Sequence, residues 1–469
     1  MGRTAPTSVL IVGSGVFGLS TAWALSKRKE FAKTEITVVD DVRGGSFPPA
    51  DVASVDSSRI IRPDYSDRHY CALASVAQEE WRKQGDDDLG GQGRYSESGL
   101  LLMADTPTQV KKGKLSGMDY VKNSWQNVDS IARESGYPPG KIRTLGNKEA
   151  IQKFLDAPGC NADWGYINEL SGWADAGRGM EWLYKQVKAT GRVKFVDAKV
   201  EELVTDGKRV VGTRLSSGSI LRGELVFVAA GAWTGQLIDV RGRIEATGQA
   251  VAYIDITEKE LDVLKKQPVA LNLSTGLFII PPQDKVLKVA RHAYGYLNPV
   301  TVTNALPPSP SHPKQSIVAS LPLTSRNGYP NYLPVDADSD LRRGLKELSP
   351  ISGLETRPWK ETRLCWYADT RDGDWLIDYH PGWDGLFVAT GGSGHGYKFL
   401  PVLGDKIADC ILGHGGELGD KWRWKNIPED GSGKEHNGVY QGLQTDDGSR
   451  SCTFGMILQD ELAKTKAKL

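Results

Sequence analysis

A glycine-rich turn near the start of the chain has the pattern of a phosphate-binding loop. Residues 13–18 read Gly-Ser-Gly-Val-Phe-Gly, between an apolar run and a segment with helical character. Glycines at these three positions permit a tight turn, close approach of the backbone to a pyrophosphate, and close packing of helix on strand. The helix N-terminus also offers N–H groups to an anion. Asp40, about 20 positions further on, stands where a carboxylate accepts hydrogen bonds from a ribose. These features predict a dinucleotide site, with NAD and FAD both open.

A second glycine cluster, residues 391–396 (Gly-Gly-Ser-Gly-His-Gly), follows another apolar run late in the chain. The apolar run argues against an ordinary surface turn. A flavin needs a second close approach of the backbone near its phosphates and ring, whereas a simple NAD domain does not. The cluster is not a nucleophile elbow, because His395 stands where that motif requires its last glycine.

Further residues have the types that an oxidative site uses. Arg59 and Arg62 stand three positions apart, and a guanidinium in a cleft is a rigid fork suited to a carboxylate or a flavin oxygen. The alternative is a solvated basic pair. Lys288 stands four positions before His292, and its alternative role is that of a lysine on the exposed face of a strand. Cys365 is one of five cysteines, and burial as a structural thiol is the usual fate of a free cysteine.

Short apolar runs supply the strands that must position these residues. Residues 8–12 and 36–40 are continuous apolar runs with β-branched side chains, the kind that is buried in parallel sheets, and residues 19–25 between them favour a helix. Further strands are expected at 193–204, 210–215, 225–231 and 385–392, with a turn at 205–208.

Two segments of different texture, 87–165 and 245–355, interrupt these apolar strands. They are richer in polar alternation, proline and long loops. We therefore predict an α/β fold with two interleaved domains. A Rossmann-like FAD-binding domain takes 1–86, 166–244 and 356–469, and an α+β substrate domain on a mainly antiparallel sheet takes 87–165 and 245–355.

The composition excludes several classes of function. Lys and Arg number 58, and Asp and Glu also number 58, which disfavours binding to nucleic acid or to an anionic membrane surface. Five cysteines fit a reducing compartment and no disulfide framework. No apolar run has the length of a membrane span, the start of the chain does not read as a signal peptide, and Cys and His lack zinc-type spacing. We expect no metal.

With these elements in hand, the chain resembles the family of monomeric sarcosine oxidases and fructosyl-amino-acid oxidases (amadoriases), with its fungal saccharopine and pipecolate oxidase branch. The resemblance extends from the first strand to about residue 425. It rests on the N-terminal glycine motif and on three further motifs, which are Ser-Ser-Arg-Ile-Ile-Arg at 57–62, Cys-Trp-Tyr-x-Asp-Thr at 365–370 together with Asp-Tyr-His-Pro at 378–381, and Ser-Gly-His-Gly-Tyr-Lys-Phe at 393–399.

The resemblance implies roles for individual residues. Cys365 would carry FAD through a thioether to its 8α-methyl group, and Lys288 would promote the reaction with O2. The other residues implied to be catalytic are His292, Arg59 and Tyr367, and the residues implied to bind the substrate carboxylate are Arg62, Lys398 and Arg423. The predicted cofactor-binding residues are Gly13, Ser14, Gly15, Val16, Phe17, Gly18, Asp40, Asp41, Ser58, Arg59, Val200, Gly231, Trp233, Cys365, Gly394, His395, Gly396, Tyr397 and Lys398.

The expected reaction is oxidation of the C–N bond of a secondary amine, such as an N-alkyl amino acid, to an imine, with O2 reduced to H2O2. Amadoriases typically carry a lysine at the position of Arg59, so a sugar-bearing substrate is less favoured. Three alternatives stay open. One is a secondary-metabolism oxidase that acts on an N-methyl aromatic amino acid for ring closure. The second, outside the family, is an NAD(P)-dependent dehydrogenase, which would not explain Cys365 or the Arg59–Arg62 pair. The third is a non-catalytic nucleotide-binding or sensor protein, which would not require Lys288 and Lys398.

The last three residues, Ala467-Lys468-Leu469, are a variant of the Ser-Lys-Leu peroxisomal address. They predict a peroxisomal location, with the import receptor as a partner, and the cytoplasm otherwise. The other partners expected are a small amine substrate and O2, with the protein a monomer.

Overall fold

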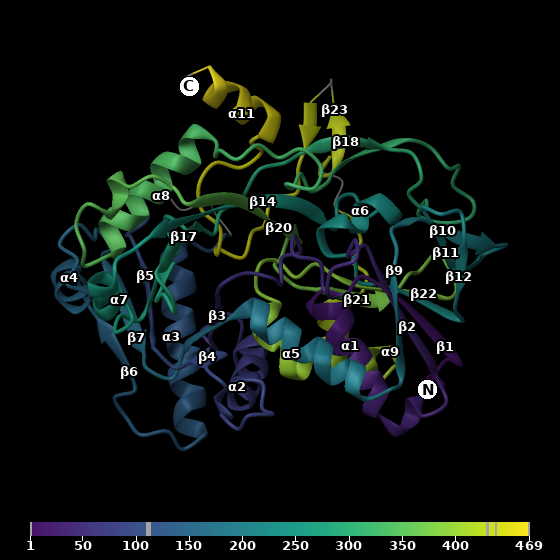
Figure 1. Ribbon diagram of the computed structural model, residues 1–469, viewed down its shortest axis with the longest axis horizontal. Helices are drawn as coiled ribbons and strands as arrows, with labels where there is room; N and C mark the ends of the chain where they lie inside the picture. Colours follow the sequence, from purple (N-terminus) through teal and green to yellow (C-terminus); the bar gives the residue numbers. More distant parts are fainter. Residues whose placement is uncertain (1, 109–113, 428–430, 437–438, 468–469) are drawn as a thin grey trace.

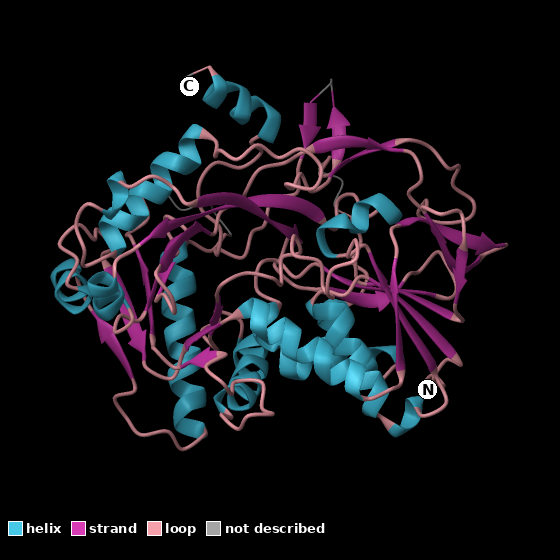
Figure 2. Ribbon diagram, viewed as in Figure 1, coloured by secondary structure: helices cyan, strands magenta, loops and turns pink. Residues whose placement is uncertain are grey.

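The computed structural model describes residues 2–108, 114–427, 431–436 and 439–467, and two large sheets carry most of its strands (Figures 1 and 2). The first sheet has the Rossmann pattern, in which all neighbours are parallel except the last pair, β21 with β22. Its central strands are buried because helices cover one face and a small sheet within residues 200–222 covers the other, which explains their uninterrupted apolar sequences. Its order is β21 (Leu376–Tyr379), β22 (Leu386–Thr390), β13 (Leu225–Val228), β1 (Ser8–Val12), β2 (Glu35–Asp40) and β9 (Val193–Asp197).

Three helices pack together against this sheet, namely α1 (Val16–Lys27), α5 (Ala176–Ala189) and α9 (Leu400–Ile411). Helix α1 begins directly after the glycine loop, so its N-terminus points to the end of β1. Helix α2 (Arg68–Arg82) extends the group toward the second sheet.

The second sheet has eight strands and is antiparallel except where β15 meets β5. Strand β5 is buried on both faces, because Leu100 and Leu102 belong to one apolar cluster and Leu101 and Met103 to another. Helix α3 (Gly117–Glu134) covers the first face and α8 (Val335–Leu348) the second. The order is β20 (Glu361–Asp369), β14 (Glu245–Asp255), β17 (Val286–Arg291), β16 (Leu277–Ile280), β15 (Val269–Asn272), β5 (Leu100–Ala104), β7 (Trp164–Asn168) and β6 (Ile142–Leu145).

Smaller elements complete the described chain. The small sheets are β3 (Arg59–Ile61) with β8 (Gly172–Ala174) and β4 (Tyr95–Ser96), β10 (Val200–Asp206) with β11 (Arg209–Leu215) and β12 (Ile220–Arg222), β18 (Pro299–Val302) with β19 (Ile317–Ser320), and β23 (Lys434–His436) with β24 (Val439–Gln441). The further helices are α4 (Lys148–Leu155), α6 (Thr234–Leu237), α7 (Glu258–Leu264), α10 (Gly416–Trp422) and α11 (Leu458–Lys466).

The predicted fold class is confirmed, with a Rossmann-like sheet interleaved with a mainly antiparallel one. Two details differ. The strand expected at 193–204 is two strands, since β9 joins the Rossmann sheet and β10 joins a separate sheet. Residues 198–199 between them include neither glycine nor proline, so the break left no signal in the sequence. Strand β20, which we assigned to the FAD-binding domain, forms the edge of the eight-stranded sheet by pairing with β14.

None of the described helices combines the length and apolar character needed to cross a membrane. Within the same described residues, no cluster of three or more His, Cys, Asp or Glu side chains is arranged to hold a metal ion.

Candidate functional site

Two cavities meet between the two large sheets. The first, of about 470 Å³, lies at the carboxyl ends of the Rossmann strands, where open α/β sheets bind their ligands. The second, of about 500 Å³, extends toward the eight-stranded sheet. Side chains from both halves of the molecule line both cavities and mark their junction, namely Arg59, Tyr367, Gly394, His395 and Tyr397.

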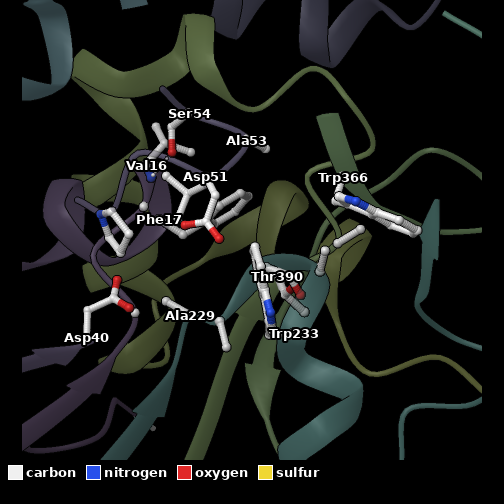
Figure 3. A pocket seen from close by; sticks show the side chains of 18 of the residues that line it. Val16, Phe17, Asp40, Asp51, Ala53, Ser54, Ala229, Trp233, Trp366 and Thr390 are labelled. Atoms are coloured by element: carbon white, nitrogen blue, oxygen red, sulfur yellow. Dashed lines mark hydrogen bonds between the residues drawn. The ribbon is translucent and has the colours of Figure 1, made fainter. Parts of the chain in front are cut away.

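The glycine loop that opens the first cavity fits only glycine. Gly13 has a φ of +103°, and a Cβ atom there would lie 2.5 Å from the carbonyl oxygen of Ala229. A Cβ on Gly18 would lie 1.9 Å from the carbonyl oxygen of Gly13. Figure 3 shows Val16 and Phe17 following the loop at the cavity wall. The loop therefore brings bare backbone and the start of α1 to the cavity, which fits a pyrophosphate.

Most of the predicted cofactor residues line this first cavity. They are Gly13, Gly15, Val16, Phe17, Asp40, Asp41, Arg59, Val200, Gly231, Trp233, Gly394, His395, Gly396 and Tyr397. Of the rest, Ser14 is buried under the loop and Gly18 packs against Gly13. Ser58 and Lys398 line the second cavity. A dinucleotide with a ring at the junction fits this arrangement.

Asp40 lies at the end of β2 beside the glycine loop, as Figure 3 shows. Its Oδ2 accepts hydrogen bonds of 2.7 Å from both the backbone N–H and the hydroxyl of Ser14. Burial raises the pKa of Asp40 above its ordinary value, although the hydrogen bonds from Ser14 lower it in part. The carboxylate therefore also holds the loop in place, a contact that the sequence did not indicate.

A buried carboxylate, Asp56, organises the junction, although no role for it was expected. It pairs with Arg59, accepts a 2.8 Å hydrogen bond from Lys288 Nζ and accepts a 2.6 Å hydrogen bond from the Tyr253 hydroxyl. Burial opposes its ionisation, but Arg59 and Lys288 outweigh burial and hold the pKa of Asp56 well below its ordinary value. Asp56 is therefore an anion that fixes two cations at the cavity wall.

Lys288 lies on β17 with its side chain 4% exposed and lines the second cavity. Its Nζ also donates to the carbonyl oxygen of Ser58 at 2.8 Å. Burial lowers the pKa of Lys288 to about 8, against the attraction of Asp56. Lys285, three positions earlier, is exposed. Of these two lysines, only Lys288 lines a cavity.

Cys365 lies on β20, and its side chain is among the buried ones. Arg59 Nη2 lies 3.3 Å from its Sγ and donates to the carbonyl oxygen of Ala53 at 2.7 Å. Tyr367, two residues further along the strand, lines both cavities. The thiol thus lies next to the junction residues, while all five cysteines of the chain are free.

Arg62 and Lys398 line the second cavity together. Arg62 is buried, and among the described residues its Nη1 finds no hydrogen-bond partner. Lys398 Nζ donates to the Tyr65 hydroxyl at 2.8 Å and to the carbonyl oxygen of His395 at 3.0 Å. Burial and the nearby Arg62 lower the pKa of Lys398 well below its ordinary value. An anion bound here would accept a hydrogen bond from Arg62 Nη1 and raise the pKa of Lys398 toward its ordinary value.

Arg423 lies apart from the other residues expected to bind the substrate carboxylate. It follows α10, is exposed and lines neither cavity. Trp422 before it is buried, so the tryptophan anchors this turn and leaves the arginine directed to solvent. The side chain from this helix that reaches the second cavity is Lys421.

Comparisons with known proteins agree with this geometry. The sequence model of the family described as FAD dependent oxidoreductase matches residues 8–410. The amino acid oxidase imqH of Aspergillus flavus is 33% identical over 463 positions, covering 87% of this chain and 93% of that protein. The L-saccharopine oxidase of Schizosaccharomyces pombe is 30% identical over 438 positions, covering 89% and 93%.

The structural comparison points to the same group. The crystal structure of the deglycating enzyme fructosamine oxidase from Aspergillus fumigatus (Amadoriase II) has a TM-score of 0.73 at 25% identity, covering 96% of this chain and 95% of that one. The predicted resemblance is confirmed. Since the family model spans most of the chain and includes the glycine loop at the first cavity, this chain belongs to the FAD dependent oxidoreductase family.

Proposed function

We propose that this chain is an FAD-dependent oxidase of a secondary amine that carries a carboxylate. It would oxidise a C–N bond to an imine and reduce O2 to H2O2. The names of the relatives, an amino acid oxidase and a saccharopine oxidase, support this reaction class. The observation that carries the proposal is the unpartnered Arg62 Nη1 beside Lys398 in a cavity that joins the cofactor cavity at Tyr367.

The chain's own residues would orient the amine and manage charge. FAD, when bound, accepts a hydride equivalent from the carbon next to nitrogen and passes electrons to O2. Arg62 and Lys398 would bind the carboxylate and so hold the C–H bond at the junction. Lys288 would supply positive charge for the reaction with O2. The eight-stranded sheet and the Rossmann sheet together would exclude bulk water from this space.

The proposed covalent link between Cys365 and the flavin makes a direct prediction. In the wild type, the yellow colour should stay with the protein pellet after acid precipitation. In Cys365→Ser the flavin should appear in the supernatant, because a serine hydroxyl forms no thioether. Cys365 lines neither cavity but lies beside Arg59 at their junction, whereas Cys410 is a half-buried thiol on α9, so Cys410→Ser is the matched control and should keep its colour. Colour released from the wild type would refute the link.

A second candidate, oxidation of an N-methyl aromatic amino acid for ring closure, is favoured by one feature of the second cavity. Part of its wall is apolar or aromatic and would hold a ring better than a sugar. The residues of that wall are Ile60, Tyr120, Leu271, Phe278 and Ile280.

A panel assayed by peroxide release tests the function and separates the candidates. The panel contains sarcosine, pipecolate, saccharopine, a fructosyl amino acid and N-methyltyrosine, each beside its decarboxylated amine. We expect peroxide from at least one acid and far less from its matched amine. Preference for N-methyltyrosine would favour the second candidate. No peroxide from any compound would refute the amine oxidase.

The proposed peroxisomal location rests on Ala467-Lys468-Leu469, of which Lys468 and Leu469 lie outside the described residues. A more distant relative named peroxisomal sarcosine oxidase from Homo sapiens supports it. A fluorescent protein fused ahead of the chain should colocalise with a peroxisomal marker in a fungal cell. Removal of the last three residues should make it diffuse, and an unchanged pattern would contradict the prediction. The monomeric state also stays a prediction.

A further inference from the structure

The C-terminal part of the chain returns to the second cavity after leaving the region that the family model matches, which ends at residue 410. Asp447 and Ser449 line that cavity, and Ser451 forms a bridge to Ala293 just after β17. Figure 1 shows this part of the chain in yellow beside β14 and β20. A segment distant from the predicted motifs therefore supplies part of the wall of the candidate substrate cavity.

Arg450 in this segment connects three parts of the site. Its side chain is 1% exposed and its Nη2 pairs with Asp369 and donates to the carbonyl oxygen of Ser393 at 3.0 Å. Its Nη1 lies 2.9 Å from Nδ1 and 3.1 Å from Nε2 of His292. Its guanidinium carbon lies 5.3 Å from the ring centroid of Tyr367. One side chain thus contacts β20, the second glycine cluster and the cavity histidine.

The chemistry of these contacts fixes the protonation of His292. A guanidinium has only donors, so of the two ring nitrogens close to Nη1 only the unprotonated one can accept its hydrogen bond, and this contact favours a neutral imidazole. Burial lowers the pKa of His292 well below its ordinary value, and Arg450, Arg62, His395 and Lys398 lower it further. Arg450 is the largest of these electrostatic causes.

Asp369 keeps Arg450 in this position. It lies on β20, and its Oδ2 also accepts a 2.6 Å hydrogen bond from Thr247 on β14. Burial raises the pKa of Asp369, and the positive charge of Arg450 lowers it in part. The ion pair therefore depends on the close contact between the two side chains. Without Arg450, the buried Asp369 would lose the cation that offsets the effect of burial on its pKa.

We propose that Arg450 is a positioning residue that holds His292 neutral and fixed at the wall of the substrate cavity. The catalytic role of this contact rests on the proposed function, whereas the contact between Arg450 and His292 does not. A second positive charge at His292 would compete with Lys398 and Arg62 for the carboxylate and would oppose a cationic amine. The neutral ring instead leaves one nitrogen to hydrogen bond and adds no charge.

The test follows the titration of His292 by NMR in the flavin-loaded protein, with histidine labelled at Cε1 and the signal assigned by its loss in His292→Gln. In the wild type we expect no titration near pH 6.5, the ordinary value for histidine. In Arg450→Met the midpoint should rise above that of the wild type, while burial, Arg62 and Lys398 keep it below the ordinary value of about 6.5. If Arg450→Met does not fold, Arg450→Met with Asp369→Asn removes both charges, and the midpoint should still rise toward about 6.5.

Tyr440→Phe is the matched control, because Tyr440 anchors the same segment by hydrogen bonds of 2.9 and 3.0 Å to Glu245 and does not contact His292. It should leave the His292 titration as in the wild type. In Arg450→Met, kcat/KM should fall at acid pH with the same midpoint as the His292 titration. The wild type and Tyr440→Phe should lack this fall.

Two results would overturn the assignment. One is an unchanged His292 titration in the folded Arg450 variants, and the other is a Tyr440→Phe variant that reproduces their shift. If the wild type oxidises no amine, the titration still reports on the contact between Arg450 and His292. A failure of the proposed function is thereby separated from a failure of this inference.

Discussion

Replacing Lys288 by Met is expected to slow the reaction of the reduced enzyme with O2 by about 10²–10³-fold, the cost of removing one well-placed electrostatic group. Anaerobic reduction by substrate should change far less. The reason is that Lys288 Nζ is a buried cation, held by Asp56 and the Ser58 carbonyl, in a cavity that adjoins the cofactor cavity. In the variant, Asp56 retains Arg59 and Tyr253, so the junction keeps its main anchor. Stopped-flow spectroscopy measures the two half-reactions separately.

The same residue predicts a pH dependence. Burial lowers the pKa of Lys288 to about 8, so the cation is present below that pH and is lost as the pH rises through it. The O2 reaction of the wild type should therefore weaken above about pH 8, and that of Lys288→Met should lack this limb. Lys285→Met, at an exposed lysine of the same hairpin, is the control and should behave as the wild type. Equal slowing of both half-reactions in Lys288→Met would refute its role with O2.

Replacing Arg62 by Met is expected to lower kcat/KM for the carboxylate substrate by about 10²–10³-fold, which corresponds to about 3–4 kcal/mol. The guanidinium is buried with Nη1 directed into a protein environment that offers it no partner among the described residues. A carboxylate that fills this position makes a charge-assisted hydrogen bond in place of that unmet one. Steady-state assays with the best acid from the peroxide panel measure the loss.

The matched amine without a carboxylate makes this prediction specific. For that amine, Arg62→Met should change kcat/KM little, because the contact that the variant removes is absent from the start. Arg423→Met is the matched control variant, since Arg423 is exposed and lines neither cavity, and it should behave as the wild type. An equal loss for acid and amine would mean that Arg62 acts on the fold and not on the carboxylate.

The parts of the site that could be predicted are those whose chemistry is local in sequence. The glycine loop at 13–18 was visible because strand, turn and helix follow one another, and the structure explains Gly13 and Gly18 by the backbone atoms that a Cβ there would meet at under 3 Å. Lys288, His292, Arg62 and Lys398 were predicted from motifs in a known family, and they line one cavity.

The parts that could not be predicted depend on packing between distant segments. Asp56 stands directly before the motif at 57–62, but its pairing with Lys288 is set by how β17 lies against the segment before β3. Arg450 lies 158 residues from His292 and beyond the matched region of the family, so no spacing connected them. The exposed position of Arg423 could not be predicted for a related reason, since burial of Trp422 sets the direction of that turn.

Anaerobic mixing of the purified protein with one equivalent of the best secondary amino acid tests the central claim most directly. The flavin absorbance should bleach, return on admission of air, and yield one equivalent of H2O2 for each equivalent of substrate oxidised. A colourless protein, or a yellow protein whose flavin none of the secondary amines reduces, would contradict the assignment as an FAD-dependent amine oxidase.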